Sequence, residues 1–262
     1  MKIWLGRWKD FLRYRDLLKH LIARDIKLKY RRSILGYLWS ILDPLFIMIV
    51  MTIVFSKMFD RSIENYPVYL FTGNIIFSFL RTSSTQAMNA VINNASLIKK
   101  TYIPKYIFVF VKISSCLVEL ILTMIALLLI MVVTGAKFSF YNLLFPLVLI
   151  PLFVFCLGLG LFLAQANVFF TDVKYIYNAV ITAWMYLSAI FYPVESLPDG
   201  VKSAVEHFNP IYYYIRQFRD LLYVGQMPAP FYIIAGCIAA ILMLCLGVFS
   251  FLKNQDKFIL HI

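Results

Sequence analysis

Long apolar runs dominate this sequence of 262 residues and restrict what it can fold into. Each run is close to the ~20 residues that an α-helix needs to cross a bilayer core. Only 15% of the residues are charged, against about 25% in soluble domains. The sequence therefore predicts an all-α integral membrane protein with six transmembrane helices and excludes a soluble enzyme. The helices are expected at about 36–58, 66–88, 106–134, 141–167, 175–193 and 231–252.

The positive charge is concentrated at one end of the chain. Lys and Arg number 25 against 13 Asp and Glu, and eleven of these cations lie in residues 1–32. With both termini in the cytoplasm, the cytoplasmic segments carry 17 cations and the outer segments 6. Because Lys and Arg are retained on the cytoplasmic side, we predict a multi-pass membrane protein with both termini inside. The basic segment is expected to meet anionic lipid and not nucleic acid.

Residues 1–32 form a segment of their own, distinct from a six-span domain over 33–262. Within it, apolar residues recur at helical spacing among basic ones, namely Trp4, Leu5, Trp8, Phe11 and Leu12. Tryptophan with basic residues is typical of a helix that lies in the membrane interface. A docking face for a cytoplasmic partner is an equally open interpretation.

The outer segment between the fifth and sixth runs, about 194–224, contains a helix-start signal. Asn209 is a good N-cap and Pro210 suits the first helical position. Apolar residues then recur on one face, and Gly225 ends the pattern. We predict short outer gate helices that re-enter the membrane; an ordinary surface helix is the alternative.

The second apolar run carries a line of polar side chains on one helical face. Unsatisfied polar groups in hydrocarbon cost several kcal/mol, so this face must meet protein or water. It predicts either a translocation pathway or a polar seam between helices. The pathway candidates on this face are Asn74, Ser78, Arg81 and Thr85, with Asn89 following them.

Glu119 is a charge near the middle of the third run. Counting 1.5 Å per residue from the loop that joins the second and third runs, Arg81 and Glu119 differ in depth by only about 5 Å. We therefore predict an ion pair between Arg81 and Glu119. In the fifth run, Tyr177, Trp184 and Phe191 recur every seven residues. This stripe indicates either helix packing or flat faces for sliding sugar rings.

Motifs for catalysis and nucleotide binding are missing from the sequence. It has no P-loop, GxSxG or HExxH pattern, so we expect no catalytic residue and no nucleotide site in this chain. The four cysteines lie inside apolar runs and the three histidines are far apart, which predicts neither disulfides nor a metal site. Energy for transport must then come from a partner or an ion gradient.

Several segments together resemble the type-2 ATP-binding-cassette (ABC) exporter permeases of bacteria, which export cell-surface polysaccharides. The resemblance lies in residues 29–45 (KYRRSILGYLWSILDPL), 93–106 (NNASLIKKTYIPKY) and 168–173 (VFFTDV), and in the order of Phe191-Tyr192-Pro193, Leu197-Pro198, Asn209-Pro210 and Arg219. Thr171 departs from the family pattern, in which a basic residue often stands there.

This resemblance implies a homodimer in the bacterial cytoplasmic membrane with two copies of a separate ATPase subunit, which would bind ATP and Mg. It implies a coupling loop at about 92–105 that contacts the ATPase through Leu97, Ile98, Lys99, Lys100, Tyr102, Pro104 and Lys105, and an outer gate with Tyr192, Pro193, Asn209, Pro210 and Arg219. The implied cargo is a lipid-linked polysaccharide such as O-antigen or teichoic acid. Alternatives are an exporter of a lipid, drug or antibiotic, and a membrane-embedded glycosyl or acyl transferase.

Overall fold

The computed structural model describes residues 14–31, 33–59, 63–101 and 103–260. Within these ranges the chain is helical and contains no strand. The amphipathic stripe of residues 1–13 and the candidate Tyr102 lie outside the described residues. The elements are α2 (Arg15–Tyr30), η1 (Gly36–Leu38), α3 (Trp39–Phe59), α4 (Tyr66–Met88), α5 (Ala90–Asn93), α6 (Ala95–Lys100), α7 (Tyr106–Val133), η2 (Phe140–Leu144), α8 (Pro146–Phe169), α9 (Val173–Tyr186), η3 (Val194–Ser196), α10 (Asp199–Phe208), α11 (Pro210–Arg219), η4 (Asp220–Val224), α12 (Pro230–Asn254) and η5 (Gln255–Leu260).

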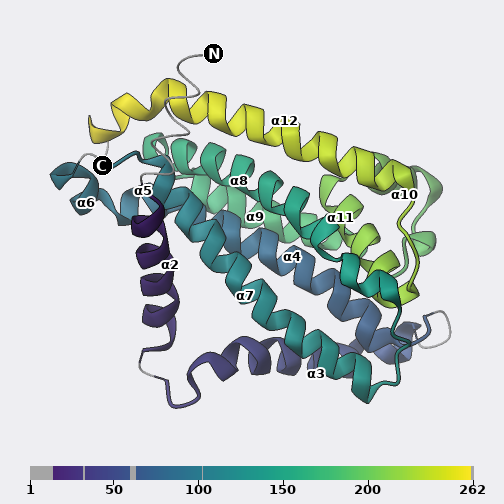
Figure 1. Ribbon diagram of the computed structural model, residues 1–262. Coiled ribbons are helices and arrows are strands. Elements are labelled where there is room, and N and C mark those ends of the chain that lie inside the picture. The colour runs from purple at the N-terminus through teal and green to yellow at the C-terminus, as the bar shows by residue number, and fades with distance from the viewer. Residues whose placement is uncertain (1–13, 32, 60–62, 102, 261–262) are drawn as a thin grey trace.

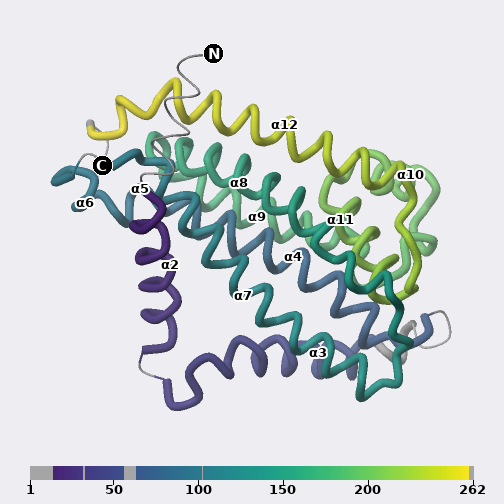
Figure 2. The backbone as a smooth tube through the Cα atoms, in the orientation of Figure 1, coloured from purple at the N-terminus to yellow at the C-terminus, as the bar shows by residue number. Residues whose placement is uncertain are grey.

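The long helices form a bundle with two distinct ends (Figure 1). One end, which we call the α6 end, holds α5, α6 and the C-terminal turn η5; the other, the α10 end, holds α10 and α11. Figure 2 traces the chain from α2 into α3, back along α4 and out again along α7. Helix α4 packs against α7, α8 and α11 and is the most enclosed of the long helices.

Helices α8 and α12 approach each other most closely, because glycines meet at their contact. A Cβ atom added to Gly247 would lie 2.0 Å from the carbonyl oxygen of Gly158, and one added to Gly158 would lie 2.4 Å from backbone atoms of Met243 and Leu244. Small residues that allow such backbone approach are common between membrane helices. This contact joins α12, whose remaining surface is largely exposed, to the rest of the bundle.

Four described helical stretches are long and apolar enough to cross a membrane: Gly36–Phe55, Tyr106–Val133, Phe140–Phe169 and Pro230–Ile259. They correspond to the first, third, fourth and sixth expected helices. The second, α4, has the expected bounds but carries many polar residues, and most of its side chains are buried by neighbouring helices. A helix shielded in this way does not need the apolar composition of a lipid-exposed one.

The fifth helix is shorter than the sequence predicted. The expected helix over 175–193 is observed as α9 with 14 residues, and it ends at Tyr186. Turns follow, in which Ala189 has a φ of 48°, a left-handed conformation that is uncommon for a residue with a Cβ. The chain therefore leaves the helix seven residues early.

The two helices of the outer segment differ: α11 is packed into the bundle, whereas α10 is mostly exposed and buries only Val205. Asn209 caps α11 by accepting a hydrogen bond from the amide of Ile211, and Pro210 occupies the first turn, as predicted. The side chains of Ile211, Ile215 and Phe218 are fully buried. Helix α11 contacts α4 and α12, so the alternative of a loose surface helix does not hold.

Candidate functional site

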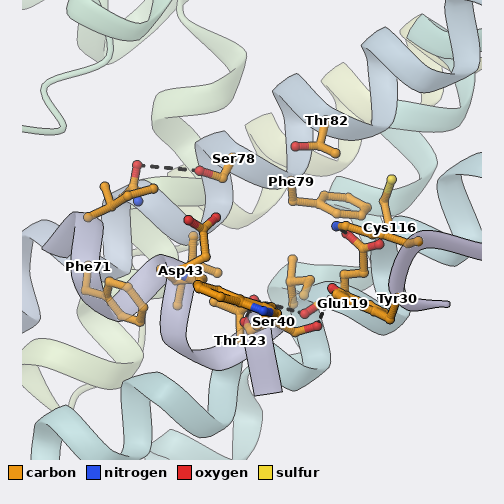
Figure 3. A pocket seen from close by; sticks show the side chains of 17 residues that line it. Tyr30, Ser40, Asp43, Phe71, Ser78, Phe79, Thr82, Cys116, Glu119 and Thr123 are labelled. Carbon is orange, nitrogen blue, oxygen red and sulfur yellow. Dashed lines mark hydrogen bonds and ion pairs between the residues drawn. The ribbon is translucent and has the colours of Figure 1, made fainter. Parts of the chain in front are cut away.

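A pocket of about 330 Å³ lies between α2, α3, α4 and α7 (Figure 3). Its lining combines carboxylates, hydroxyl and amide groups with aromatic rings, and consists of Lys29, Tyr30, Trp39, Ser40, Asp43, Pro44, Ile47, Phe71, Asn74, Ile75, Ser78, Phe79, Thr82, Cys116, Glu119, Leu120 and Thr123. Helix α7 contributes lining residues between positions 116 and 123. At 1.5 Å per residue, these positions lie about 15 to 26 Å along the helix from Tyr106. The pocket therefore lies beside the middle of α7.

Two of the polar residues that the sequence analysis placed on one face of α4 line this pocket. Asn74 is partly buried and Ser78 is exposed, and Ser78 lies 3.5 Å from the Asn74 amide oxygen. Further along α4, Arg81 is exposed and Thr85 is partly buried. Most of the rest of α4 is packed against the bundle. Within the described chain, then, the polar face is open at Ser78 and Arg81, whereas at its end Asn89 accepts from Asn167 of α8 at 3.4 Å.

Glu119 pairs with Lys29 and not with Arg81. The Lys29 ammonium donates to the Glu119 carboxylate at 2.7 Å, and no ion pair joins Arg81 to Glu119 among the described residues. The predicted pair was wrong because α2 occupies the side of α7 that carries Glu119, whereas Arg81 lies on the exposed face of α4. Similar depth along two helices does not determine which faces meet.

A second ion pair ties the same two helices together one to two turns away. The Lys112 ammonium lies 2.6 Å from the Asp25 carboxylate, whose other oxygen accepts from Arg24 at 3.0 Å. Asp25 and Lys29 are four residues apart on α2, so both face α7. Helix α2 is thereby fixed along α7 with its last turn beside the pocket, which places this described part of the basic segment against the bundle.

The three aromatic residues predicted to form one helical stripe do not share a helix, because Tyr177 and Trp184 lie on α9 and Phe191 lies in the turns after it. The Tyr177 hydroxyl donates to Ser84 Oγ at 2.6 Å, and the Trp184 indole donates to Asn209 Oδ1 at 2.8 Å. Phe191 stacks on Phe55 with ring centroids 5.5 Å apart. Of the two interpretations left open by the sequence, the contacts within this chain favour packing for these three residues.

At the α10 end, Arg219 holds the turn that follows α9. It is buried, and its two terminal nitrogens donate to the carbonyl oxygens of Ala189 and Ile190, each at 2.9 Å. Its guanidinium carbon lies 3.6 Å from the centre of the Tyr69 ring. Tyr69 in turn donates to the carbonyl oxygen of Tyr192 at 2.9 Å. The predicted gate residues Arg219 and Tyr192 are thus brought together around the helix-breaking turn.

Asn209 joins the same region from the other side. Its amide accepts from Trp184 and donates to the carbonyl oxygen of Leu187 at 3.0 Å and to Ser188 Oγ at 3.1 Å. Pro193 precedes η3, and Pro210 begins α11. Hydrogen bonds of Asn209, Arg219 and Tyr192 therefore fix α11 against the end of α9 and the turns that follow it.

At the α6 end, the predicted coupling residues divide into two groups. Lys99 and Lys100 are exposed, whereas Ile98 is buried and Leu97 and Pro104 are partly buried. Lys105 turns toward the C-terminal turn: its ammonium donates to the carbonyl oxygen of Gln255 at 2.5 Å and lies 5.6 Å from the centre of the Phe258 ring. Partial burial lowers the pKa of the Lys105 ammonium, and the charge of the nearby Asp256 carboxylate opposes this shift only in part.

The sequence analysis missed Asp43, Lys29 and the glycine contact. Asp43 stands within an apolar run just before Pro44, so a charge inside a predicted span could have marked it. Lys29 is one of many cations in the basic N-terminal segment, and nothing in the sequence distinguishes it from the others. Among the described residues no group of three His, Cys, Asp or Glu side chains could hold a metal.

These features define an all-helical membrane protein with long apolar helices and an open polar face. A family model for the ABC-2 type transporter matches residues 16–223, which is well over half of the chain. The chain belongs to this transporter family, as its resemblance in sequence predicted.

Curated relatives align over most of the chain. The O-antigen export system permease protein RfbA of Myxococcus xanthus is 25% identical over 251 residues, covering 95% of this chain and 96% of its own length. The protein of the same name from Klebsiella pneumoniae is 28% identical, with 93% of each chain covered. The polysialic acid transport protein KpsM of Escherichia coli is 25% identical over 79% of this chain and 81% of its own.

Proposed function

We propose that this chain is the membrane subunit of an ATP-driven exporter that moves a lipid-linked cell-surface polysaccharide across the bacterial cytoplasmic membrane. The observation that carries the proposal is the near full-length similarity to permeases named for O-antigen export, together with the shorter match to a protein named for polysialic acid transport. The open polar face of α4 supports it, because a polar cargo needs such a surface in the membrane. O-antigen and teichoic acid are the cargoes we consider first.

In this proposal a separate ATPase binds at the α6 end and holds ATP and Mg. Lys99 and Lys100 are exposed beside the buried Ile98, so α6 can present its charged side while its apolar side stays anchored to the bundle. A push on α6 would then reach α4 and α7, which flank the α5–α6 segment in the chain.

A second copy of the chain would complete the pathway. In a single chain, Ser78 and Arg81 are exposed on α4. Only 6% of an 18-residue apolar window within the first span, Gly36–Phe55, is buried by the rest of the chain. A polar face beside a poorly covered helix suits an interface that encloses a polar route between two copies. We assign six membrane helices to each copy, counting α4 and the short α9, and both termini to the cytoplasm.

The test is co-expression of the tagged chain with candidate ABC ATPase subunits from the same cell, followed by purification from the membrane. We expect an ATPase at one copy per chain. Reversing charge at α6 with Lys99→Glu and Lys100→Glu should reduce its recovery severalfold. The matched control reverses the exposed Lys137 and the partly buried Lys202, both far from α6, as Lys137→Glu and Lys202→Glu, and should leave recovery unchanged.

Loss of surface polysaccharide on deletion of the chain would support the cargo. A chain that purifies without any ATPase, and gives unchanged surface polysaccharide when deleted, would contradict the proposal. Export of a lipid or drug with intact polysaccharide would keep the transporter and replace the cargo.

A further inference from the structure

The feature that most needs explanation is the carboxylate of Asp43. Asp43 lies in α3, in an apolar stretch with the length and composition of a membrane span. Its side chain is exposed, and no hydrogen bond or ion pair involves it in the part of the chain that the structure describes. A charge in a membrane helix is costly unless it meets water or a polar partner. Asp43 must therefore face water or a polar ligand.

Glu119, the other carboxylate of the same pocket, differs in this respect. Its charge is neutralised by Lys29 at 2.7 Å, and its side chain is 18% exposed. The pocket thus holds one carboxylate that is fixed in an ion pair and one that retains its full capacity to accept hydrogen bonds. Figure 3 shows Asp43 projecting from α3 toward the side of the pocket that carries Ser78.

The opposite wall offers donors and acceptors at helical spacing. Asn74, Ser78 and Thr82 follow each other at intervals of four on α4, so they face the same pocket. The 3.5 Å separation of Ser78 and Asn74 is at the limit of a hydrogen bond. Both groups therefore remain free to exchange this weak contact for a bond to a ligand.

An aromatic ring completes the lining. Trp39 stands one turn before Asp43 on α3, lines the pocket and is 39% exposed, whereas Phe71 and Phe79 are buried. Aromatic side chains offer an apolar face to a ligand, and a few placed polar groups fix its orientation. A pyranose ring has the matching chemistry, because its hydroxyl groups project from the edge and its C–H groups lie on the faces.

We propose that this pocket is a binding subsite for a pyranose unit of the transported chain, in which Asp43 accepts hydrogen bonds from ring hydroxyls and Trp39 contacts the ring face. The inference rests on the proposed function and adds to it a place for the cargo. The volume of about 330 Å³ is at the lower end of small-molecule pockets, about 300–1,000 Å³. It suits a short stretch of sugar and not a folded polymer.

Helix α2 is one wall of this subsite. Lys29 and Tyr30 come from its last turn, and Tyr30 is hydrogen-bonded to Ser40 of α3 at 2.5 Å. The sugar site is therefore closed on one side by the segment that the ion pairs Asp25–Lys112 and Lys29–Glu119 attach to α7.

The test uses the whole exporter in its own cells, with p-benzoylphenylalanine placed at Ile47 or at Ile53. Ile47 lines the pocket, whereas Ile53 lies on the same helix, is 68% exposed and does not line it. On illumination we expect a carbohydrate-stained adduct of the chain from position 47 and none from position 53. Carbohydrate adducts from both positions or from neither, or an adduct between two chains without carbohydrate from position 47, would overturn the subsite.

A second measurement compares export by variants of Asp43. Asp43→Leu should lower surface polysaccharide about tenfold or more, as when a site built to bind hydroxyl groups loses its partner. Asp43→Asn, which still accepts, should lower it less, and Ile53→Ala is the control. ATPase recovery is measured for every variant. Normal export by Asp43→Leu with the ATPase bound would refute the subsite alone, whereas absence of the ATPase from the unmodified chain would refute the exporter.

Discussion

The ammonium of Lys29 and the carboxylate of Glu119, 90 residues apart in sequence, form a hydrogen-bonded ion pair of 2.7 Å. The pair joins the last turn of α2 to the middle of α7 and forms part of the pocket wall. A helix from the basic N-terminal segment therefore contributes to the site where we place the cargo.

Replacing one partner of the pair should destabilise the chain. Lys29→Met leaves the partly buried Glu119 carboxylate without its cation. The free energy of unfolding should fall by about 1–3 kcal/mol, which is more than for an exposed pair and less than for a fully buried one. Thermal unfolding in one detergent measures it. The charge-swapped double variant Lys29→Glu with Glu119→Lys should recover most of the loss, and Arg81→Met should have little effect. Equal losses from Lys29→Met and Arg81→Met would contradict this pairing.

Gly247→Ala should separate α8 from α12. The new Cβ would lie 2.0 Å from the Gly158 carbonyl oxygen, so the backbones must move apart. Overpacking of this kind costs about 1–3 kcal/mol or more. The control is Gly200→Ala, because a Cβ there meets nothing within 4 Å. We expect a lower Tm for Gly247→Ala only; the same Tm in both variants would show that the helices are not in this contact.

Arg219→Lys should not preserve the outer assembly, although the charge is kept. One ammonium cannot reproduce two parallel bonds to Ala189 and Ile190 together with stacking on Tyr69. Each hydrogen bond to a charged group contributes about 1.5–3 kcal/mol. Limited proteolysis of the 188–198 turn should therefore become faster. Arg15→Lys, at an exposed site, is the control, and an unchanged cleavage rate for Arg219→Lys would count against the clamp.

Lys105→Met should release the C-terminal turn. The variant loses the bond to the Gln255 carbonyl and the contact with Phe258, so hydrogen exchange over Gln255–Leu260 should increase at least severalfold. Lys105→Arg should retain most protection, because it can still donate to the carbonyl. Lys100→Met, at an exposed lysine of α6, should leave exchange there unchanged. Faster exchange in the Lys100 variant alone would reverse our assignment of the two lysines.

The sequence by itself determined the local features. The third helix was expected at about 106–134 and is observed as Tyr106–Val133, because a long apolar run has few other structures open to it in a membrane. The Asn209–Pro210 start of α11 was also predictable, since an N-cap depends on neighbouring residues alone. The early end of α9 at Tyr186 was not, because the turn is held by Arg219, which lies 30 residues after Ala189 in sequence.

Only the tertiary structure decided which faces meet. Periodicity placed Asn74 and Ser78 on one face of α4, but it could not tell that Asp43 and Trp39 line the same pocket. Counting depth along the helices predicted the wrong partner for Glu119. Periodicity did not decide whether Tyr177 and Trp184 pack against other helices. The physical reason is that the outside of a membrane protein is as apolar as its inside. Hydropathy therefore marks where helices lie, and contacts between residues far apart in the chain decide how they are arranged.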